Sequence, residues 1–125
     1  MKFFLSLVAV IVFFSGCEVI PDPVEEFIPG IYARHYIDEF TDSYDTIEIK
    51  PIVKRTDHSY VVFMRKKFVK ITDGTVSGPF YDVKRWEADY DKNKKVLWIG
   101  VVGKTIYFDP HRKELKIGIQ PYKKL

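Results

Sequence analysis

The side chain with the most reactive chemistry is that of Cys17, the only cysteine among 125 residues. A single cysteine excludes an internal disulfide and any metal site that needs several cysteines. Cys17 follows an uncharged run and precedes Glu18 and the proline-rich stretch PDP at residues 21–23. In an exported chain a free thiol here would be prone to oxidation, whereas a modified thiol would be protected.

The first sixteen residues have the layout of a secretory signal peptide. Lys2 supplies a positive start, residues 3–14 are almost entirely apolar, and Ser15 and Gly16 are small. The apolar run, about 12 residues long, is shorter than the roughly 20 residues of an ordinary membrane-spanning helix. We therefore predict that residues 1–16 are a cleaved leader. An ordinary secreted protein and an uncleaved anchor are the alternatives.

The stretch FSGC, residues 14–17, resembles the lipobox of bacterial lipoproteins. Phe14 departs from the usual pattern, in which leucine is commoner. The resemblance implies that the sulfur of Cys17 receives a diacylglycerol and that the new amine is acylated, and several acyl chains anchor a protein firmly. The acidic residues that follow resemble those of Bacteroidota lipoproteins. The implied location is the outer membrane of a bacterial envelope, on either its periplasmic or its outer side.

Residues 17–29 combine the cysteine with a segment of three prolines and four acidic residues, EVIPDPVEEFIP. This composition predicts an extended tether rather than a helix or a strand. The folded domain is predicted to be residues 30–125.

From Gly30 onward apolar and polar residues alternate, as Ile47 and Ile49 do with Glu48 and Lys50. This period is typical of half-buried antiparallel strands. Turn signals such as Asp73-Gly74 and residues 77–79 (Ser-Gly-Pro) separate them. The predicted strands are 30–38, 44–52, 59–70, 80–90, 95–102, 104–109 and 113–119, with 120–124 as a candidate eighth. We expect an all-β, up-and-down barrel, with an open twisted sheet or flattened sandwich as the alternative.

This order of elements, with Gly30-Ile31-Tyr32 on the first strand, is similar to the small lipocalin-like lipoproteins of bacteria. Lipocalins usually carry Gly-x-Trp there, and Tyr32 replaces the tryptophan. The resemblance rests on architecture and covers residues 30–125. It implies a binding or scaffolding role.

The other residues with chemistry do not form a known catalytic motif. His35, His58 and His111 lack metal-site spacing, so no metal and no cofactor is predicted. The carboxylates of YIDEFTDSYD (Asp38, Glu39, Asp42 and Asp45) lack the turn glycine and the spacing of a calcium loop and favour an acidic hairpin. We therefore expect no catalytic residues and no enzyme.

Two surfaces are candidates for binding. RKKFVK supplies Arg65, Lys66, Lys67 and Lys70, a basic patch for anionic headgroups or an acidic polymer, although ordinary solubilising charge explains it as well. In VLWIG both faces of the strand are apolar. If Val96 and Trp98 face inward, an outward patch of Leu97, Ile99 and Val101 would contact a partner.

The formal net charge of +3 is too small and too scattered to predict nucleic-acid binding. The sequence therefore predicts a membrane-anchored, non-enzymatic binding or scaffolding module for another protein or an envelope component. A lipocalin-like carrier of a small apolar ligand and an inhibitor of an envelope-attacking enzyme such as lysozyme are the alternatives.

Overall fold

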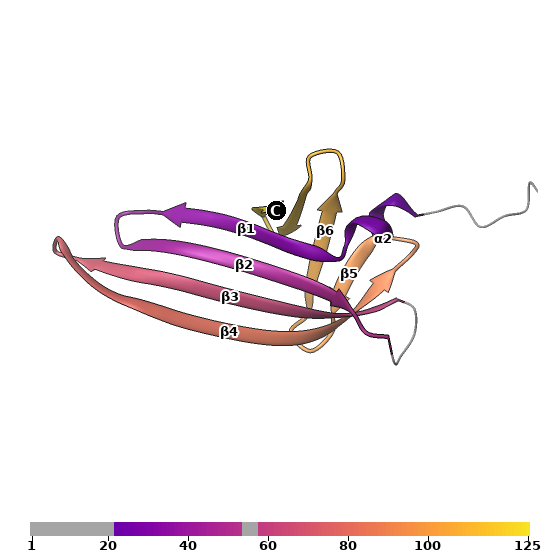
Figure 1. The fold of residues 1–125 in the computed structure, drawn as a ribbon, viewed down its shortest axis with the longest axis horizontal. Helices are drawn as coiled ribbons and strands as arrows, with labels where there is room; N and C mark the ends of the chain where they lie inside the picture. Colours follow the sequence, from indigo (N-terminus) through magenta and orange to yellow (C-terminus); the bar gives the residue numbers. More distant parts are fainter. Residues whose placement is uncertain (1–21, 54–57) are drawn as a thin grey trace, which may run out of the picture.

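The computed structural model describes residues 22–53 and 58–125. Within them eight antiparallel strands pair in chain order, and the last strand pairs with the first (Figure 1). The protein is therefore a closed up-and-down β-barrel, which confirms the predicted fold over the open sheet and the sandwich.

The described residues form one short helix and eight strands, and each predicted strand has its counterpart. The elements are α2 (Pro23–Phe27), β1 (Gly30–Ile37), β2 (Thr41–Pro51), β3 (Ser59–Thr72), β4 (Thr75–Asp91), β5 (Val96–Ile99), β6 (Lys104–Asp109), β7 (Glu114–Ile117) and β8 (Gln120–Lys124). The candidate eighth strand at 120–124 is real, and it closes the barrel against β1.

The strands differ greatly in length, and this difference shapes the molecule. β3 and β4 have 14 and 17 residues, whereas β5 and β7 have 4 each. β4 pairs with β5 only from Asp89 to Asp91, and β1 pairs with β8 only at Tyr32 and Ala33. Residues 34–46 and 65–84 of β1–β4 therefore continue past the barrel as a curved four-stranded extension, here called the projecting sheet (Figure 1).

The apolar core fills the barrel at the end that carries α2. Alternation along each strand directs one set of side chains inward. The buried cluster comprises Ile28, Tyr32, Ile47, Ile49, Tyr60, Val62, Ala88, Tyr90, Leu97, Ile99, Ile106, Leu115 and Tyr122. Because side chains pack this end, we call it the closed end and the opposite end the open end.

The prediction that residues 17–29 form an extended tether is wrong for the part that the structure describes. Residues 23–27 form helix α2, since the carboxylate of Asp22 accepts hydrogen bonds from the backbone N–H groups of Val24 and Glu25. Pro23 sits in the first turn, where its missing N–H has no cost. Ile28 is fully buried, so the folded domain begins before Gly30.

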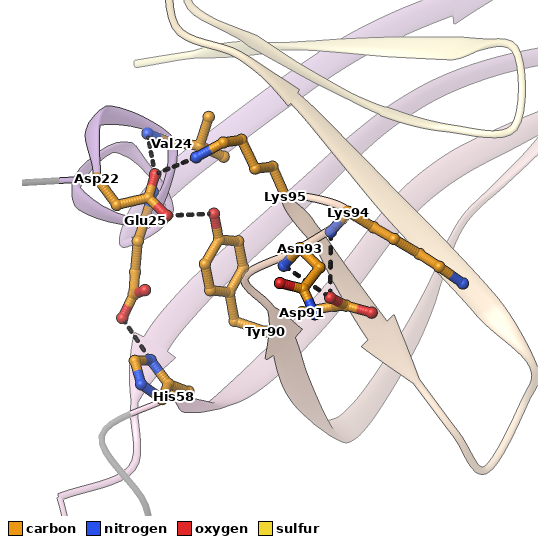
Figure 2. A network of polar contacts seen from close by, with 9 residues as sticks. All are labelled: Asp22, Val24, Glu25, His58, Tyr90, Asp91, Asn93, Lys94 and Lys95. Carbon is orange, nitrogen blue, oxygen red and sulfur yellow. Dashed lines mark hydrogen bonds and ion pairs between the residues drawn. The ribbon is translucent and has the colours of Figure 1, made fainter.

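A polar network fastens α2 to the barrel (Figure 2). The hydroxyl of Tyr90 donates a 2.7 Å hydrogen bond to Asp22, and the ammonium of Lys95 lies 3.6 Å from the same carboxylate. On the other side of α2, Glu25 lies 2.7 Å from the ring nitrogen Nδ1 of His58. These contacts join the helix to β4, to the β4–β5 turn and to the start of β3.

Burial and charge set the protonation of this network. Burial alone would raise the pKa of Asp22, but hydrogen bonds from Tyr90 and the backbone, with the charge of Lys95, hold it below the ordinary value. Burial raises the pKa of Tyr90, and it raises that of Tyr60 to about 12. At neutral pH an ionised Asp22 is therefore paired with the neutral phenol of Tyr90.

Of the two turn signals expected between β3 and β4, only the first forms the turn. Asp73 and Gly74 have φ of 51° and 76° and make the tight turn, because both central positions of such a hairpin need positive φ. Residues 77–79 do not form a turn. They lie inside β4, opposite a register shift between Phe68 and Lys70. Gly78 has φ of 116°, which suits such an irregularity.

The predicted leader, residues 1–16, and Cys17 lie outside the described residues. Among the residues that are described, no helix is both long and apolar enough to cross a membrane.

Candidate binding site at the open end of the barrel

The inward face of the barrel changes from apolar to charged toward the open end. On β1, Arg34 follows the buried Tyr32 two residues later, and on β2, Asp45 comes two residues before the buried Ile47. Residues two apart share a face of a strand. These charges therefore point to the same side as the core.

β3 and β4 repeat this change, because Lys66 follows Met64 and Lys84 precedes Trp86. The register aligns Met64 with Lys84, and Lys66 with Asp82. Lys and Asp thus face each other directly across the pair of strands.

These side chains surround a cavity of about 220 Å³ at the open end. Four cations and two carboxylates are among its lining residues: Arg34, Lys66, Lys84, Lys104, Asp45 and Asp82. The excess of positive charge favours an anionic group, and the carboxylates limit how much of the cationic surface is available.

Arg34 is the most enclosed cation of this site. Its side chain is 16% exposed, and its guanidinium lies 5.0 Å from the ring centre of Tyr36 and 5.6 Å from that of Tyr122. One of its terminal nitrogens lies 3.8 Å from Asp45, but its buried Nε makes no hydrogen bond within the described chain. Since an Arg N–H is a strong donor, this atom is a candidate contact for an incoming acceptor.

Asp45 and Tyr122 fix the electrostatics beside Arg34. Asp45 is 4% exposed and accepts a 2.6 Å hydrogen bond from the hydroxyl of Ser43. Burial raises the pKa of Tyr122, and the nearby carboxylate of Asp45 raises it further, against the opposing effect of Arg34. Tyr122 is therefore a neutral phenol under ordinary conditions.

Aromatic rings continue the site along the projecting sheet. Phe68 and Phe80 lie opposite each other in register, with ring centres 5.5 Å apart. The ammonium of Lys66 lies 6.0 Å from the ring of Phe68, and that of Lys70 lies 5.3 Å from the ring of Phe80. The inner face of the projecting sheet thus offers apolar rings between cations.

The predicted basic patch does not form one surface. Lys66 and Lys70 contact the rings of the inner face, whereas Arg65 and Lys67 lie on the outer face, because neighbours on a strand point in opposite directions. Arg65 makes a 3.1 Å ion pair with Glu48, and Lys67 lies 5.9 Å from the ring of Tyr81.

The predicted partner surface is wrong for two of its three residues. Leu97 and Ile99 are fully buried, whereas Val101 is 86% exposed. Leu97 lies in register with the core residues Tyr90 and Ile106, which places the 97 and 99 face inside the barrel. The outer face of β5 instead presents a tryptophan, Trp98, which is 46% exposed.

The carboxylates of the acidic stretch do not form one site, because they make separate contacts. Asp38 accepts hydrogen bonds from the backbone N–H groups of Phe40 and Thr41 in the β1–β2 turn, and these, with the hydroxyl of Tyr36, lower its pKa. Asp42 lies 2.6 Å from His35, and Asp45 faces the cavity. Across the described residues, no three His, Cys, Asp or Glu side chains gather as metal ligands.

The chain matches no protein-family model, no curated protein and no solved structure.

The sequence prediction missed most of the cavity. Arg34, Asp82, Lys84 and Lys104 were not singled out, and of the predicted patch only Lys66 lines it. A usable signal exists: each is a charged residue at an inward position of a strand that carries apolar residues at the inward positions nearer the closed end.

Proposed function

We propose that this protein is a membrane-anchored lipoprotein of a bacterial envelope, and that its β-barrel is a non-enzymatic module that binds an acidic envelope component at the open end. The observation that carries the binding role is the convergence of four cations on one cavity that the barrel itself shapes. A set of cations that the fold already gathers around one cavity attracts carboxylate or phosphate groups.

The anchor in this proposal is Cys17, after removal of residues 1–16. It is supported by the apolar leader and by the resemblance of FSGC to a lipobox. Four residues, 18–21, separate Cys17 from the described domain, and five backbone steps reach at most about 18 Å. The barrel would therefore lie close to the membrane.

The fold supports one orientation of the proposed anchor. The described chain begins at α2, and the tip of the β3–β4 hairpin lies at the opposite end of the molecule (Figure 1). A membrane anchor just before α2 would leave the open end pointing away from the membrane. This favours a soluble or neighbouring polymer over the headgroups of the membrane that holds the protein.

The binding role is tested by titrating the full-length protein in detergent with an acidic polysaccharide, polygalacturonate, and with neutral dextran. The variant Lys66→Gln/Lys84→Gln removes two inner-face charges. Lys67→Gln/Arg85→Gln removes two outer-face charges from the same strands and is the matched control. We expect the first variant to weaken binding of polygalacturonate at least tenfold and the control to bind like the wild type.

Two results would contradict the binding role. If dextran binds as well as polygalacturonate, charge does not select the ligand. If the inner-face and outer-face variants lose equal affinity, binding depends on overall charge and not on the open-end site. Vesicles of phosphatidylglycerol provide a third titration, and a preference for them over the polymer would assign the site to lipid.

The anchor is tested separately by labelling growing cells with radioactive palmitate. The wild-type chain should incorporate label and Cys17→Ser should not. Equal labelling of the two would refute lipidation at Cys17 without affecting the binding test.

A carrier role for a small apolar ligand finds less support in this geometry. The closed end is packed with side chains, and the open-end cavity is lined with charge. Carrier cavities are mostly apolar.

A further inference from the structure

The projecting sheet has a long free edge along β4. From Thr75 to Ala88, β4 pairs with β3 on one side, and no other strand of the described chain pairs with it on the other side. Free edges present unpaired N–H and C=O groups and can add a further strand. By contrast, the free edge of β1 covers only residues 34–37.

The usable part of this edge begins at Phe80, because Pro79 has no N–H to donate. From there to Ala88 the sequence is FYDVKRWEA. Tyr81 and Val83 are 69% and 64% exposed, which is high for residues of these types at the middle of a strand. The charges Lys84 and Arg85 would ordinarily discourage pairing at such an edge.

This edge is complementary to itself in one register. Two copies related by a two-fold axis pair antiparallel, and directly opposed residues lie on the same face. With Val83 opposite Val83 of the second copy, Asp82 lies opposite Lys84. The same register places Phe80 opposite Trp86.

On the outer face the same register brings Tyr81 opposite Arg85, a cation over an aromatic ring. Asp82 and Lys84 lie 3.9 Å apart as an ion pair within one chain, and both side chains are about half exposed. An exposed pair of this kind is weak, so each can exchange its partner for the opposite charge on a second copy. The register thus opposes residues that attract one another: two opposite charges, two aromatic rings, and a cation with an aromatic ring.

The neighbouring registers lack this match. A shift one way sets Asp82 against Asp82, and a shift the other way sets Lys84 against Lys84, and like charges directly opposed across strands are destabilising. We infer that the free edge of β4 pairs antiparallel with the same edge of a second copy, centred on Val83. The pairing joins two projecting sheets side by side and doubles the width of their cationic and aromatic inner face.

The occupant is a second copy rather than a foreign strand because the complementarity is internal to this one segment. This inference does not depend on the proposed ligand. It needs only the free edge and the order of charges along it.

Charge exchange tests the pairing in the full chain purified in detergent, with mass measured by analytical ultracentrifugation at about 100 µM, where dimers of micromolar affinity form. We expect the wild type to have twice the monomer mass. Asp82→Lys alone and Lys84→Asp alone should each be monomeric, because each sets like charges against each other. An equimolar mixture of the two should dimerise again, since positions 82 and 84 of one then meet opposite charges on the other.

Lys116→Asp, an exposed change of the same charge on β7, is the control and should remain dimeric. Thermal melts verify that each variant folds. Dimer formation in the mixture is a second check, because only folded chains can pair again. A monomeric wild type overturns the inference and leaves the edge to a strand of another protein. Dimeric single variants overturn it also, because they place the contact elsewhere.

A cross-link tests the register directly. In a Cys17→Ser background, Val83→Cys should form a covalent dimer under mild oxidation, because opposed Cα atoms in an antiparallel pair lie about 4.5–5.5 Å apart, within disulfide range. Val101→Cys, which is exposed but lies between β5 and β6 and outside the proposed contact, should not form a covalent dimer. A dimer that fails to cross-link at position 83 would overturn the register.

Discussion

The hydroxyl of Tyr32 on β1 lies 2.9 Å from the backbone carbonyl oxygen of Ile28, just after α2, and donates a hydrogen bond to it. It also lies 2.8 Å from the carbonyl oxygen of Phe27. Both Tyr32 and Ile28 are fully buried. The phenol thus supplies a hydrogen-bond donor to the carbonyl groups at the end of α2, which a helix this short leaves without backbone partners. This contact holds α2 over the closed end of the barrel.

Tyr32→Phe should lower the free energy of unfolding by about 1 to 2 kcal/mol, because the buried carbonyl of Ile28 loses its donor while the ring still packs. Urea unfolding measures the change. Tyr81→Phe, at a site 69% exposed, is the matched control and should change stability by less than about 0.5 kcal/mol. Equal effects at the two sites would mean that the hydroxyl of Tyr32 does not hold α2.

Ile99→Ala should lower the free energy of unfolding by about 2 to 5 kcal/mol, since it opens a cavity in the core. Val101→Ala, two residues later in the sequence and 86% exposed, should change it by less than about 0.5 kcal/mol. Urea unfolding of the pair checks this. A small change in stability at position 99 would mean that Ile99 is not a core residue.

Asp22→Asn should make the protein less stable at neutral pH and less sensitive to acid. The pKa of Asp22 is lower in the folded state than in the unfolded chain, so its charge stabilises the fold above the ordinary Asp value of 3.8. That stability is lost as pH falls from 3.8 toward the lower folded pKa. Asparagine keeps the oxygen that caps the helix but places an NH₂ group opposite the Tyr90 hydroxyl, so the change removes the charge together with that hydrogen bond.

Thermal melts of both proteins at neutral pH and near pH 3 check this expectation. The gap in melting temperature between wild type and Asp22→Asn should narrow in acid. Glu39→Gln, an exposed change of the same kind in the β1–β2 turn, is the control. A gap that stays constant with pH would show that the network at α2 does not depend on the charge of Asp22.

Salt should weaken binding at the open end if the proposed function is correct. Raising ionic strength from about 0.05 M to about 0.5 M shortens the screening length and should reduce affinity for polygalacturonate about tenfold or more. The variant Lys66→Gln/Lys84→Gln should show a shallower dependence, because fewer charges remain to be screened. Isothermal titration at each salt concentration measures both. Affinity independent of salt would exclude an electrostatic site.

Local alternation was enough to predict the strands of the barrel. Ile47 and Ile49 alternate with charges and mark β2 wherever its partners lie, and the tight turn at Asp73 and Gly74 marks a hairpin by backbone preference alone. In the tether, the three prolines outweighed a cap that is visible in the sequence, Asp22 before Pro23. The helix was missed for that reason and because the burial of Ile28 is a tertiary effect.

The sequence by itself determined that this chain forms short antiparallel strands, because side chains alternate on every strand regardless of its neighbours. Only the tertiary structure decided which face of β5 is inside, since Val96 and Trp98 are as apolar as Leu97 and Ile99. Registers across the barrel made that choice, and they also gathered the cations of β1, β3, β4 and β6 at one opening. Proximity between residues so far apart in sequence depends on pairing and closure, which no local pattern contains.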